Sequence, residues 1–171
     1  MAEAGAVRAR TASIGLFGLA LLLCGCGFHL EGRVPLPQAV ARPYIQAPDQ
    51  QSDFVQSLRR EMLMSGAHPV DSAAQATAVV DILSDNVTSR VLSVSAQNRP
   101  TEYQVNYTVR FAVTAGGREL LPPQMVSSMR SYTFDESLLL AKEHEESILQ
   151  QAMGQDLAQI VMRRLSRVPG G

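Results

Sequence analysis

The fold of this chain is decided by the stretch Thr101-Glu-Tyr-Gln-Val-Asn-Tyr-Thr-Val-Arg-Phe-Ala-Val-Thr114. From Tyr103 onward, large apolar side chains alternate with polar or small ones at a period of two, which is typical of a half-buried strand. We therefore expect one face of this strand to be buried against helices and the other to be polar and outward. The apolar set is Tyr103, Val105, Tyr107, Val109, Phe111 and Val113, and the polar set includes Gln104, Asn106, Thr108 and Arg110.

Two further strands flank this central one. Gly116-Gly117 is a hairpin signal, and residues 118–134 supply a returning strand that is interrupted by Pro122-Pro123. On the other side, residues 78–94 are rich in Val, Ile, Leu and Thr, which predicts one long strand with an irregularity near Asp85-Asn86. A fourth, short strand is expected near residues 44–47.

Helical patterns precede and follow these strands. Residues 52–66 combine a capping Ser52 or Asp53, an apolar stripe and a stop at Gly66. A last helix is predicted from residues 135–137 to about Arg167, with arginines at its end that suit the helix dipole. The order is strand, helix, three strands, helix. This predicts an α+β two-layer sandwich, with two helices packed side by side on one face of a four-stranded mixed β-sheet.

Composition excludes several classes of protein. The chain has 171 residues, of which 15 are Lys or Arg and 16 are Asp or Glu, giving a net charge of −1. There is no basic surplus for a general nucleic-acid binder, so no nucleic-acid partner is expected. The hydrophobic fraction of 46% is too high for a disordered chain, and the length suits one folded domain.

The N-terminus has the pattern of a bacterial export signal. Arg8 and Arg10 precede an uncharged apolar run, residues 14–23, which is too short to span a bilayer. The run ends in Leu23-Cys24-Gly25-Cys26, which resembles the lipobox of bacterial lipoproteins. Cys26 fits the lipidated position because Gly25 is small, whereas Leu23 is too large to precede Cys24 at a cleavage site. An uncleaved apolar helix or an ordinary secretory signal is the alternative reading.

These observations divide the chain into three parts. Residues 1–25 are expected to be a lipoprotein signal peptide, residues 26–42 a lipidated tether, and residues 43–168 the sandwich domain. By analogy with other such lipoproteins, glycine rather than aspartate at position 27 argues against retention at the inner membrane. We therefore expect a lipid-anchored protein on the periplasmic side of the outer membrane.

Catalytic chemistry is not indicated. The sequence contains no P-loop, G-x-S-x-G, G-x-G-x-x-G or H-E-x-x-H motif. Residues 143–146 are Glu-His-Glu-Glu, but four consecutive helical residues point in four directions, which favours a solvated helix face over a metal site. Acylated Cys26 would leave no free thiol. We expect no enzyme, no metal and no cofactor.

With catalysis not indicated, the remaining class of function is the binding of a ligand or partner. From Cys26 onward the chain has twelve Arg and a single Lys, and arginine binds phosphate with two hydrogen bonds. Arg110 lies on the polar side of the central strand, while Arg90 and Arg99 lie on the adjoining strand and loop. An equally open reading is that these arginines are solubilising surface charges.

Three motifs in register carry a family resemblance. They are Cys26-Gly-Phe-His-Leu30, Thr101-Glu-Tyr-Gln104 and Phe134-Asp-Glu-Ser-Leu-Leu-Leu-Ala-Lys-Glu-His-Glu-Glu146. Together they resemble the LPS-assembly lipoproteins of the LptE family, over nearly the whole chain after residue 25. The resemblance implies an outer-membrane lipoprotein that complexes with and plugs the β-barrel LptD and helps to deliver lipopolysaccharide to the cell surface.

The resemblance also implies site residues. The lysine of the family's Leu-Ala-Lys motif, associated with lipopolysaccharide contact, falls on Lys142, and a basic loop residue falls within a few positions of Arg99. With Arg90, these two are the expected lipopolysaccharide-binding residues, at one end of the sandwich. The face of Gln104, Asn106, Thr108 and Arg110 is expected to meet the barrel lumen. The alternatives are a structural lipoprotein that scaffolds a different outer-membrane complex, or a hydrolase that depends on His144.

Overall fold

The computed structural model describes residues 35–133 and 139–169, with backbone alone for residues 139–143. Several predictions therefore lie outside the described residues. These are the signal peptide over residues 1–25, the lipidated Cys26, the first part of the tether and the start of the last helix at residues 135–137.

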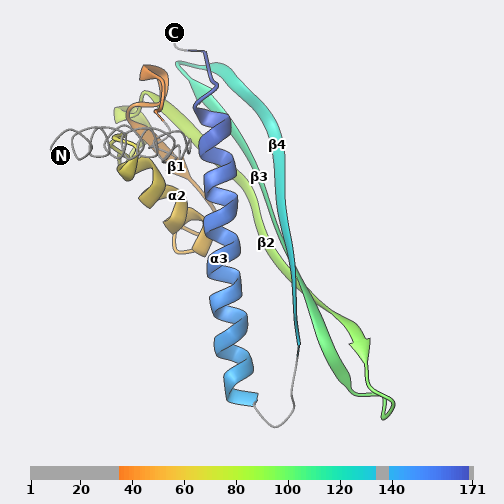
Figure 1. The fold of residues 1–171 in the computed structure, drawn as a ribbon. Helices are drawn as coiled ribbons and strands as arrows, with labels where there is room; N and C mark the ends of the chain where they lie inside the picture. Colours follow the sequence, from red (N-terminus) through yellow and green to blue (C-terminus); the bar gives the residue numbers. More distant parts are fainter. Residues whose placement is uncertain (1–34, 134–138, 170–171) are drawn as a thin grey trace, which may run out of the picture. The chain divides into compact units, whose positions relative to one another are not determined.

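The four strands form one sheet in the order in which they occur in the chain (Figure 1). They are β1 (Pro43–Gln46), β2 (Ala78–Val94), β3 (Pro100–Ala115) and β4 (Arg118–Thr133). β1 runs parallel to β2, and the other neighbours are antiparallel, so the sheet is mixed as predicted. β4 is an edge strand, which is where Pro122 and Pro123 can lie without removing a ladder hydrogen bond.

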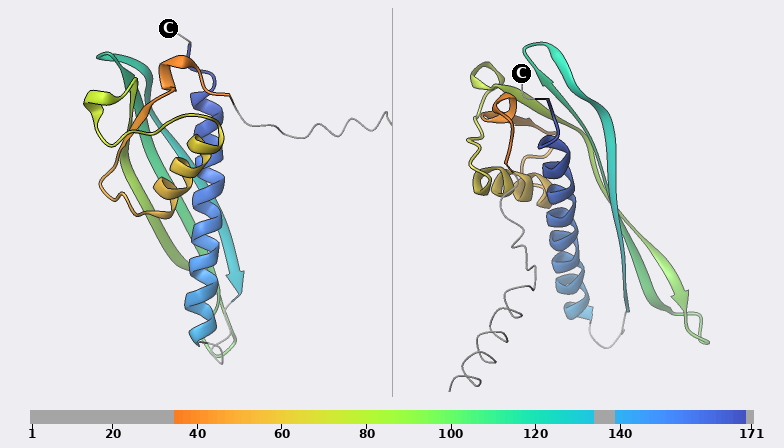
Figure 2. Two further views of the ribbon diagram at one scale, coloured as in Figure 1. Left: turned by 90° about the vertical axis from the view of Figure 1, so that its left-hand side faces the viewer. Right: turned by 45° about the horizontal axis from the view of Figure 1, so that its top comes forward.

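Both long helices lie on the same face of this sheet, as Figures 1 and 2 show. They are α2 (Asp53–Met64) and α3 (Leu139–Leu165), and they pack against each other. Two short 3-10 helices, η1 (Gln38–Val40) and η2 (Ala73–Gln75), complete the described elements. The two-layer α+β sandwich is therefore confirmed. Leu36, Ala39 and Val40, from the segment predicted as tether, pack against the core.

The alternation of apolar and polar residues in β3 matches which of its side chains are buried and which are exposed. Tyr107 and Phe111 face the helices and are 2% and 0% exposed, whereas Arg110 is exposed on the other side. The β3–β4 turn consists of Gly116 and Gly117, whose φ values of +56° and +79° are unfavourable for other residues. This tight turn holds the returning strand in register with β3.

The predicted irregularity in β2 lies earlier than expected. Pairing with β3 shifts between Ile82 and Ser84, so that Leu83 is the extra residue, and it shifts again between Val91 and Val94. Asp85 and Asn86 are themselves regularly paired, with Val109 and Thr108. The shift at Leu83 turns Asp85 toward the helices, where it accepts a hydrogen bond from Ser52 at 2.5 Å.

α2 follows its sequence pattern closely. The Ser52 hydroxyl caps it by accepting a hydrogen bond from the Val55 amide at 3.2 Å, and the chain leaves it through Gly66 at φ +84°. Its start lies directly against α3, at Gly154. A Cβ on Gly154 would lie 3.0 Å from the Phe54 nitrogen and 3.1 Å from the Asp53 carbonyl carbon. Glycine at this position therefore sets how closely the two helices approach.

The distal half of β2 is less well covered than the rest of the sheet. β1 pairs only with residues 78–81, so β2 beyond Ile82 has no further strand beside it within the described ranges. This half of β2 also carries several exposed apolar side chains. They are Leu83, Val87, Val91, Leu92 and Val94, between 38% and 53% exposed.

Candidate functional site

The sheet face that points away from the helices, called the outer face here, is lined with polar side chains. β3 contributes Gln104, Asn106, Thr108 and Arg110, and the strand register places them beside hydroxyl and amide groups of β2 and β4. These neighbours are Ser84, Asn86, Thr88, Ser127 and Ser131. Two exposed methionines, Met125 and Met129, interrupt the polar surface on β4, and the sequence analysis missed them. The outer face can therefore form many hydrogen bonds with a partner.

Several groups on the outer face are already oriented by one another. Arg90 Nε donates to Gln104 Oε1 at 2.8 Å, and Asn106 Nδ2 donates to Thr108 Oγ1 at 3.4 Å. The predicted site residue Arg90 thus belongs to the same surface as the predicted partner-facing residues. A hollow of about 430 Å³ lies here, lined by Thr88, Ser89, Arg90, Gln104, Asn106 and Met129.

Arg99 and Lys142 belong to the distal end of the domain. Arg99 is exposed in the turn between β2 and β3, where the Ser95 amide donates to the Arg99 carbonyl at 2.7 Å and Asn98 has a φ of +59°. Lys142 lies in the first turn of α3, and its side chain is outside the described residues. In Figures 1 and 2 the tip of the β2–β3 hairpin and the start of α3 lie at the same end. Arg90 is further along β2, on the outer face.

A buried polar network joins the start of α2 to the central strand. The Tyr107 hydroxyl accepts a hydrogen bond from the Phe54 amide at 3.2 Å, and the Asp85 carboxylate is the charged group that acts most strongly on it. Burial, and then the negative charge of Asp85, raise the pKa of Tyr107 well above its ordinary value. No local pattern indicates this contact, because it joins residues 53 positions apart. Its role is to fix α2 on the sheet.

A second set of contacts holds the distal half of α3 to β4. The Tyr132 hydroxyl donates to Glu146 Oε2 at 3.1 Å, and Arg130 forms an ion pair with Asp156. The Tyr132 ring also stacks on Tyr103, with ring centroids 5.7 Å apart. Burial, with the bond to Glu146, raises the pKa of Tyr132 to about 12. The Asp156 contact holds α3 to β4 close to Gly154, and the Glu146 contact holds the part of α3 that extends past the start of α2.

The domain is expected to lose stability at alkaline pH, in part through Tyr132. Above pH 10 the unfolded chain ionises this phenol, whereas the folded chain keeps its proton up to about pH 12. The unfolded state then binds fewer protons, so the free energy of unfolding falls as the pH rises through this window. Urea unfolding at about pH 9 and about pH 11, on either side of the ordinary tyrosine pKa, measures the loss.

The control for this prediction is Tyr132→Phe, which removes the ionisable group and keeps the ring. Its stability should fall less between the two pH values than that of the unchanged protein. An equal loss in both proteins would show that Tyr132 does not contribute, and would leave Tyr107 as the group responsible.

Residues 35–133 and 139–169 show neither a cluster of metal-ligating side chains nor a membrane-spanning helix. Among these residues, His, Cys, Asp and Glu side chains form no group of three that could hold a metal ion. In the same part of the chain, no helix is both long and apolar enough to cross a membrane.

Solved structures with this sandwich are bacterial lipoproteins. A lipoprotein B from Nitrosomonas europaea superposes with a TM-score of 0.67 at 28% identity, covering 82% of this chain and 90% of that one. A minor lipoprotein from Acinetobacter baumannii gives a TM-score of 0.63 at 23% identity, covering 77% and 96% of the two chains, and shows the shared fold alone. The fold is thus that of a class of envelope lipoproteins.

The family model for LptE, lipopolysaccharide assembly, matches residues 40–165, and the chain belongs to this family. An LPS-assembly lipoprotein LptE from Pectobacterium atrosepticum is 28% identical over 157 residues, covering 91% of this chain and 85% of that protein. The LptE of Yersinia pestis is 27% identical over 155 residues, with coverages of 90% and 74%. The predicted family is therefore confirmed, and its role is one of assembly rather than catalysis.

Proposed function

We propose that this chain is anchored in the outer membrane through acylated Cys26, forms a complex with the β-barrel LptD and plugs it, and binds lipopolysaccharide during its assembly at the cell surface. The division into a signal peptide (residues 1–25), a tether beginning at Cys26 and a folded body is part of this proposal. The observation that carries it is the polar outer face of a domain that belongs to the LptE family.

The outer face suits the inside of a barrel. The lumen of a transmembrane barrel is polar, so a protein that fills it needs a hydrogen-bonding exterior. Gln104, Asn106 and Thr108 are only half-buried in this domain, and Arg110 is exposed, so their polar groups are available to lumen side chains. Met125 and Met129 add flexible apolar contacts beside them.

Co-purification tests the barrel complex. A tagged chain, extracted from outer membranes in mild detergent, is expected to bring LptD with it in near-equal amounts, identified by mass spectrometry. Recovery of a different outer-membrane complex would favour the scaffold alternative. Recovery of the lipoprotein alone would argue against both.

A bulky substitution on the outer face should weaken that complex. Thr108→Trp places a large ring where the barrel wall is proposed to lie, and LptD recovery should fall by roughly tenfold or more, which is about 1.4 kcal/mol in binding free energy. The matched control is Gln155→Trp, an exposed position on α3. Equal LptD recovery with the two variants, both folded by circular dichroism, would contradict the assignment of the outer face.

The cations at the distal end are proposed to hold the anionic part of lipopolysaccharide. Its lipid A phosphates accept charge-assisted hydrogen bonds, which arginine and lysine donate. Arg99 and the backbone of Lys142 lie at the same end of the domain, and Arg90 reaches the outer face near it. These three residues form the proposed lipopolysaccharide-binding site.

Charge reversal tests this site. The double variant Arg99→Glu and Lys142→Glu is expected to bind lipopolysaccharide at least roughly tenfold more weakly, because two charge-assisted contacts are replaced by repulsion. Arg163→Glu with Arg167→Glu, at the opposite end, makes the same change in net charge and should bind normally. Unchanged affinity in the first variant, with the fold intact, would exclude Arg99 and Lys142 from the site.

A further inference from the structure

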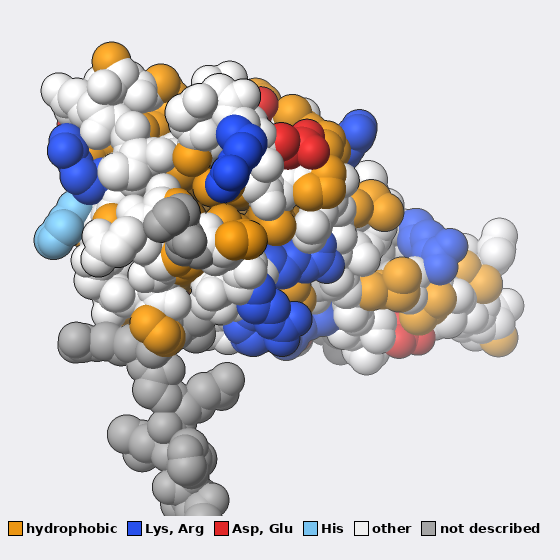
Figure 3. Space-filling view, turned by 90° about the horizontal axis from the view of Figure 1, so that it is seen from above, with side chains coloured by type: hydrophobic (Ala, Val, Ile, Leu, Met, Phe, Trp, Pro, Cys, Tyr) orange, Lys and Arg blue, Asp and Glu red, His pale blue; other side chains and the backbone are white. Residues whose placement is uncertain are grey.

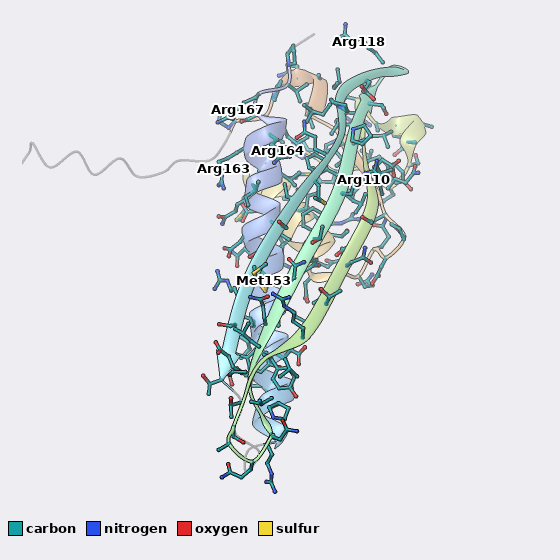
Figure 4. The ribbon with its side chains drawn as sticks, turned by 90° about the vertical axis from the view of Figure 1, so that its right-hand side faces the viewer. Arg110, Arg118, Met153, Arg163, Arg164 and Arg167 are labelled. Atoms are coloured by element: carbon teal, nitrogen blue, oxygen red, sulfur yellow. The ribbon has the colours of Figure 1, made fainter. Side chains whose placement is uncertain are left out.

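The end of the domain opposite Arg99 carries a group of arginines that the proposed function does not use. We call it the basic end and define it by Arg42, Arg118, Arg163, Arg164 and Arg167. Figure 4 shows Arg163 and Arg164 on the last turn of α3, Arg167 just after it and Arg118 at the β3–β4 turn. The sequence suggested only that the helix residues suit the helix dipole. Arg118 joins them because the topology brings the hairpin turn to the same end.

These guanidinium groups are mostly unpaired. Arg42, Arg118, Arg163 and Arg167 are exposed, and among the described residues no carboxylate forms an ion pair with any arginine of the basic end. Arg164 is held by Gln124, to whose Oε1 it donates at 2.6 Å, which also leaves its charge without a counter-ion. Seen from above in Figure 3, basic side chains are spread over this end and acidic ones are few.

The folded domain begins at the same end. In Figures 1 and 2 the first described residues lie beside the end of α3 in every view. The core contacts agree, because Val40 from η1 and Leu165 and Val168 from the end of α3 belong to one buried group. Only residues 27–34 separate Cys26 from Pro35, so even a fully extended chain spans roughly 30 Å between the two. An acyl anchor on Cys26 therefore keeps the basic end near the lipid headgroups.

Two exposed apolar side chains lie in a segment that is connected to the basic end. Leu63 and Met64, in the last turn of α2, are each 54% exposed. The chain that follows is tied to the start of the domain by a 2.9 Å hydrogen bond from the His68 amide to the Ala41 carbonyl, next to Arg42. Arginines with a few neighbouring apolar side chains are typical of surfaces that bind a membrane interface.

We infer that the basic end docks on the anionic phospholipid headgroups of the membrane that holds the acylated Cys26. This inference rests on the acylation proposed above. A lipid anchor leaves a domain free to rotate, and a basic surface beside the anchor supplies a second contact that restricts it. Docking in this way would fix the orientation of the domain relative to the bilayer.

Binding to phospholipid vesicles tests the inference without the anchor. The chain is produced without residues 1–25 and with Cys26→Ser; it keeps the whole core, which lies between Leu36 and Val168. Its flotation is compared with vesicles of phosphatidylcholine alone and of phosphatidylcholine mixed with phosphatidylglycerol. Each arginine near an anionic surface strengthens binding roughly fivefold. Arg163→Glu with Arg167→Glu should therefore lower binding to the mixed vesicles by at least roughly tenfold.

The matched control is Arg59→Glu with Arg60→Glu on α2, the same charge change at residues outside both the basic end and the proposed lipopolysaccharide-binding site. This variant should bind the mixed vesicles normally, and high salt should release both proteins. Equal binding to the two vesicle types, or equal losses in the two variants, would overturn the inference. So would an Arg163 and Arg167 variant that loses lipopolysaccharide binding but keeps vesicle binding, since the basic end would then serve the lipopolysaccharide. LptD co-purification is measured separately, so failure here does not count against the proposed function.

Discussion

Replacing Gly154 by leucine is expected to lower the free energy of unfolding by about 3 kcal/mol or more. The new side chain would occupy the space of the α2 backbone, because even a Cβ at this position lies 3.0 Å from the Phe54 nitrogen. Relief of this overlap requires α2 to move away from α3, which would break the hydrogen bond from the Phe54 amide to Tyr107. Urea unfolding followed by circular dichroism measures the change.

Two controls separate crowding from helix propensity. Gly154→Ala should also destabilise the domain, although alanine in a helix interior is about 1 kcal/mol more favourable than glycine. Gln155→Leu, at the neighbouring exposed position, should have little effect. If Gly154→Leu unfolds at the same urea concentration as the unchanged protein, the close approach of the two helices is not required for stability.

Replacing Cys26 by alanine is expected to abolish acylation and processing. The thiol is the group that carries the lipid, and the lipoprotein peptidase cuts before an acylated cysteine, so the chain should accumulate with residues 1–25 still attached. Labelled palmitate should be incorporated into the unchanged protein and absent from the variant. Intact mass measurement checks the second part, because the precursor is longer by the whole leader.

Cys24→Ala is the matched control, because it removes a thiol two positions away in the same apolar segment. This variant should take up palmitate and lose its leader normally. Palmitate incorporation in the Cys26 variant, or its loss in the Cys24 variant, would show that the lipidated position is misassigned. Retention of label in both variants would show that acylation does not depend on Cys26 alone.

Local sequence patterns predict the helices and strands, but they do not predict contacts between residues that are far apart in the chain. Alternation from Tyr103 to Val113 predicts which face of β3 is buried, and the exposures of Tyr107 and Phe111 confirm it. The β2 irregularity was misplaced because Asp85 is directed by Ser52, which lies 33 positions away and outside any local window. Strand order was also beyond local pattern, since β1 joins β2 across the whole of α2.

Some surface residues of the site can also be predicted from local sequence patterns, and others cannot. The polar residues of the outer face follow from the same alternation, and Arg99 from its turn-prone surroundings. The arginines of the basic end lie 45 or more positions apart in the chain, as Arg118 and Arg163 show, so no motif could group them. The roles of Lys142 and Arg99 come from the family resemblance, that of Cys26 from the lipobox pattern and that of Arg90 from the affinity of arginine for phosphate, and all four remain predictions.

β1 is too short to cover the whole edge of β2, and this affects how the isolated protein behaves in solution. Beyond Ile82 no other described strand lies on one side of β2, so within residues 35–133 and 139–169 its main-chain groups on that side are open to pairing, next to valines and leucines in contact with water. An exposed strand edge of this kind can pair with a strand of another polypeptide. β2 has no prolines that would prevent such pairing, whereas β4 has Pro122 and Pro123. Molecules that accumulate faster than the proposed barrel partner should therefore associate with one another, and balanced synthesis of the two proteins should limit this association.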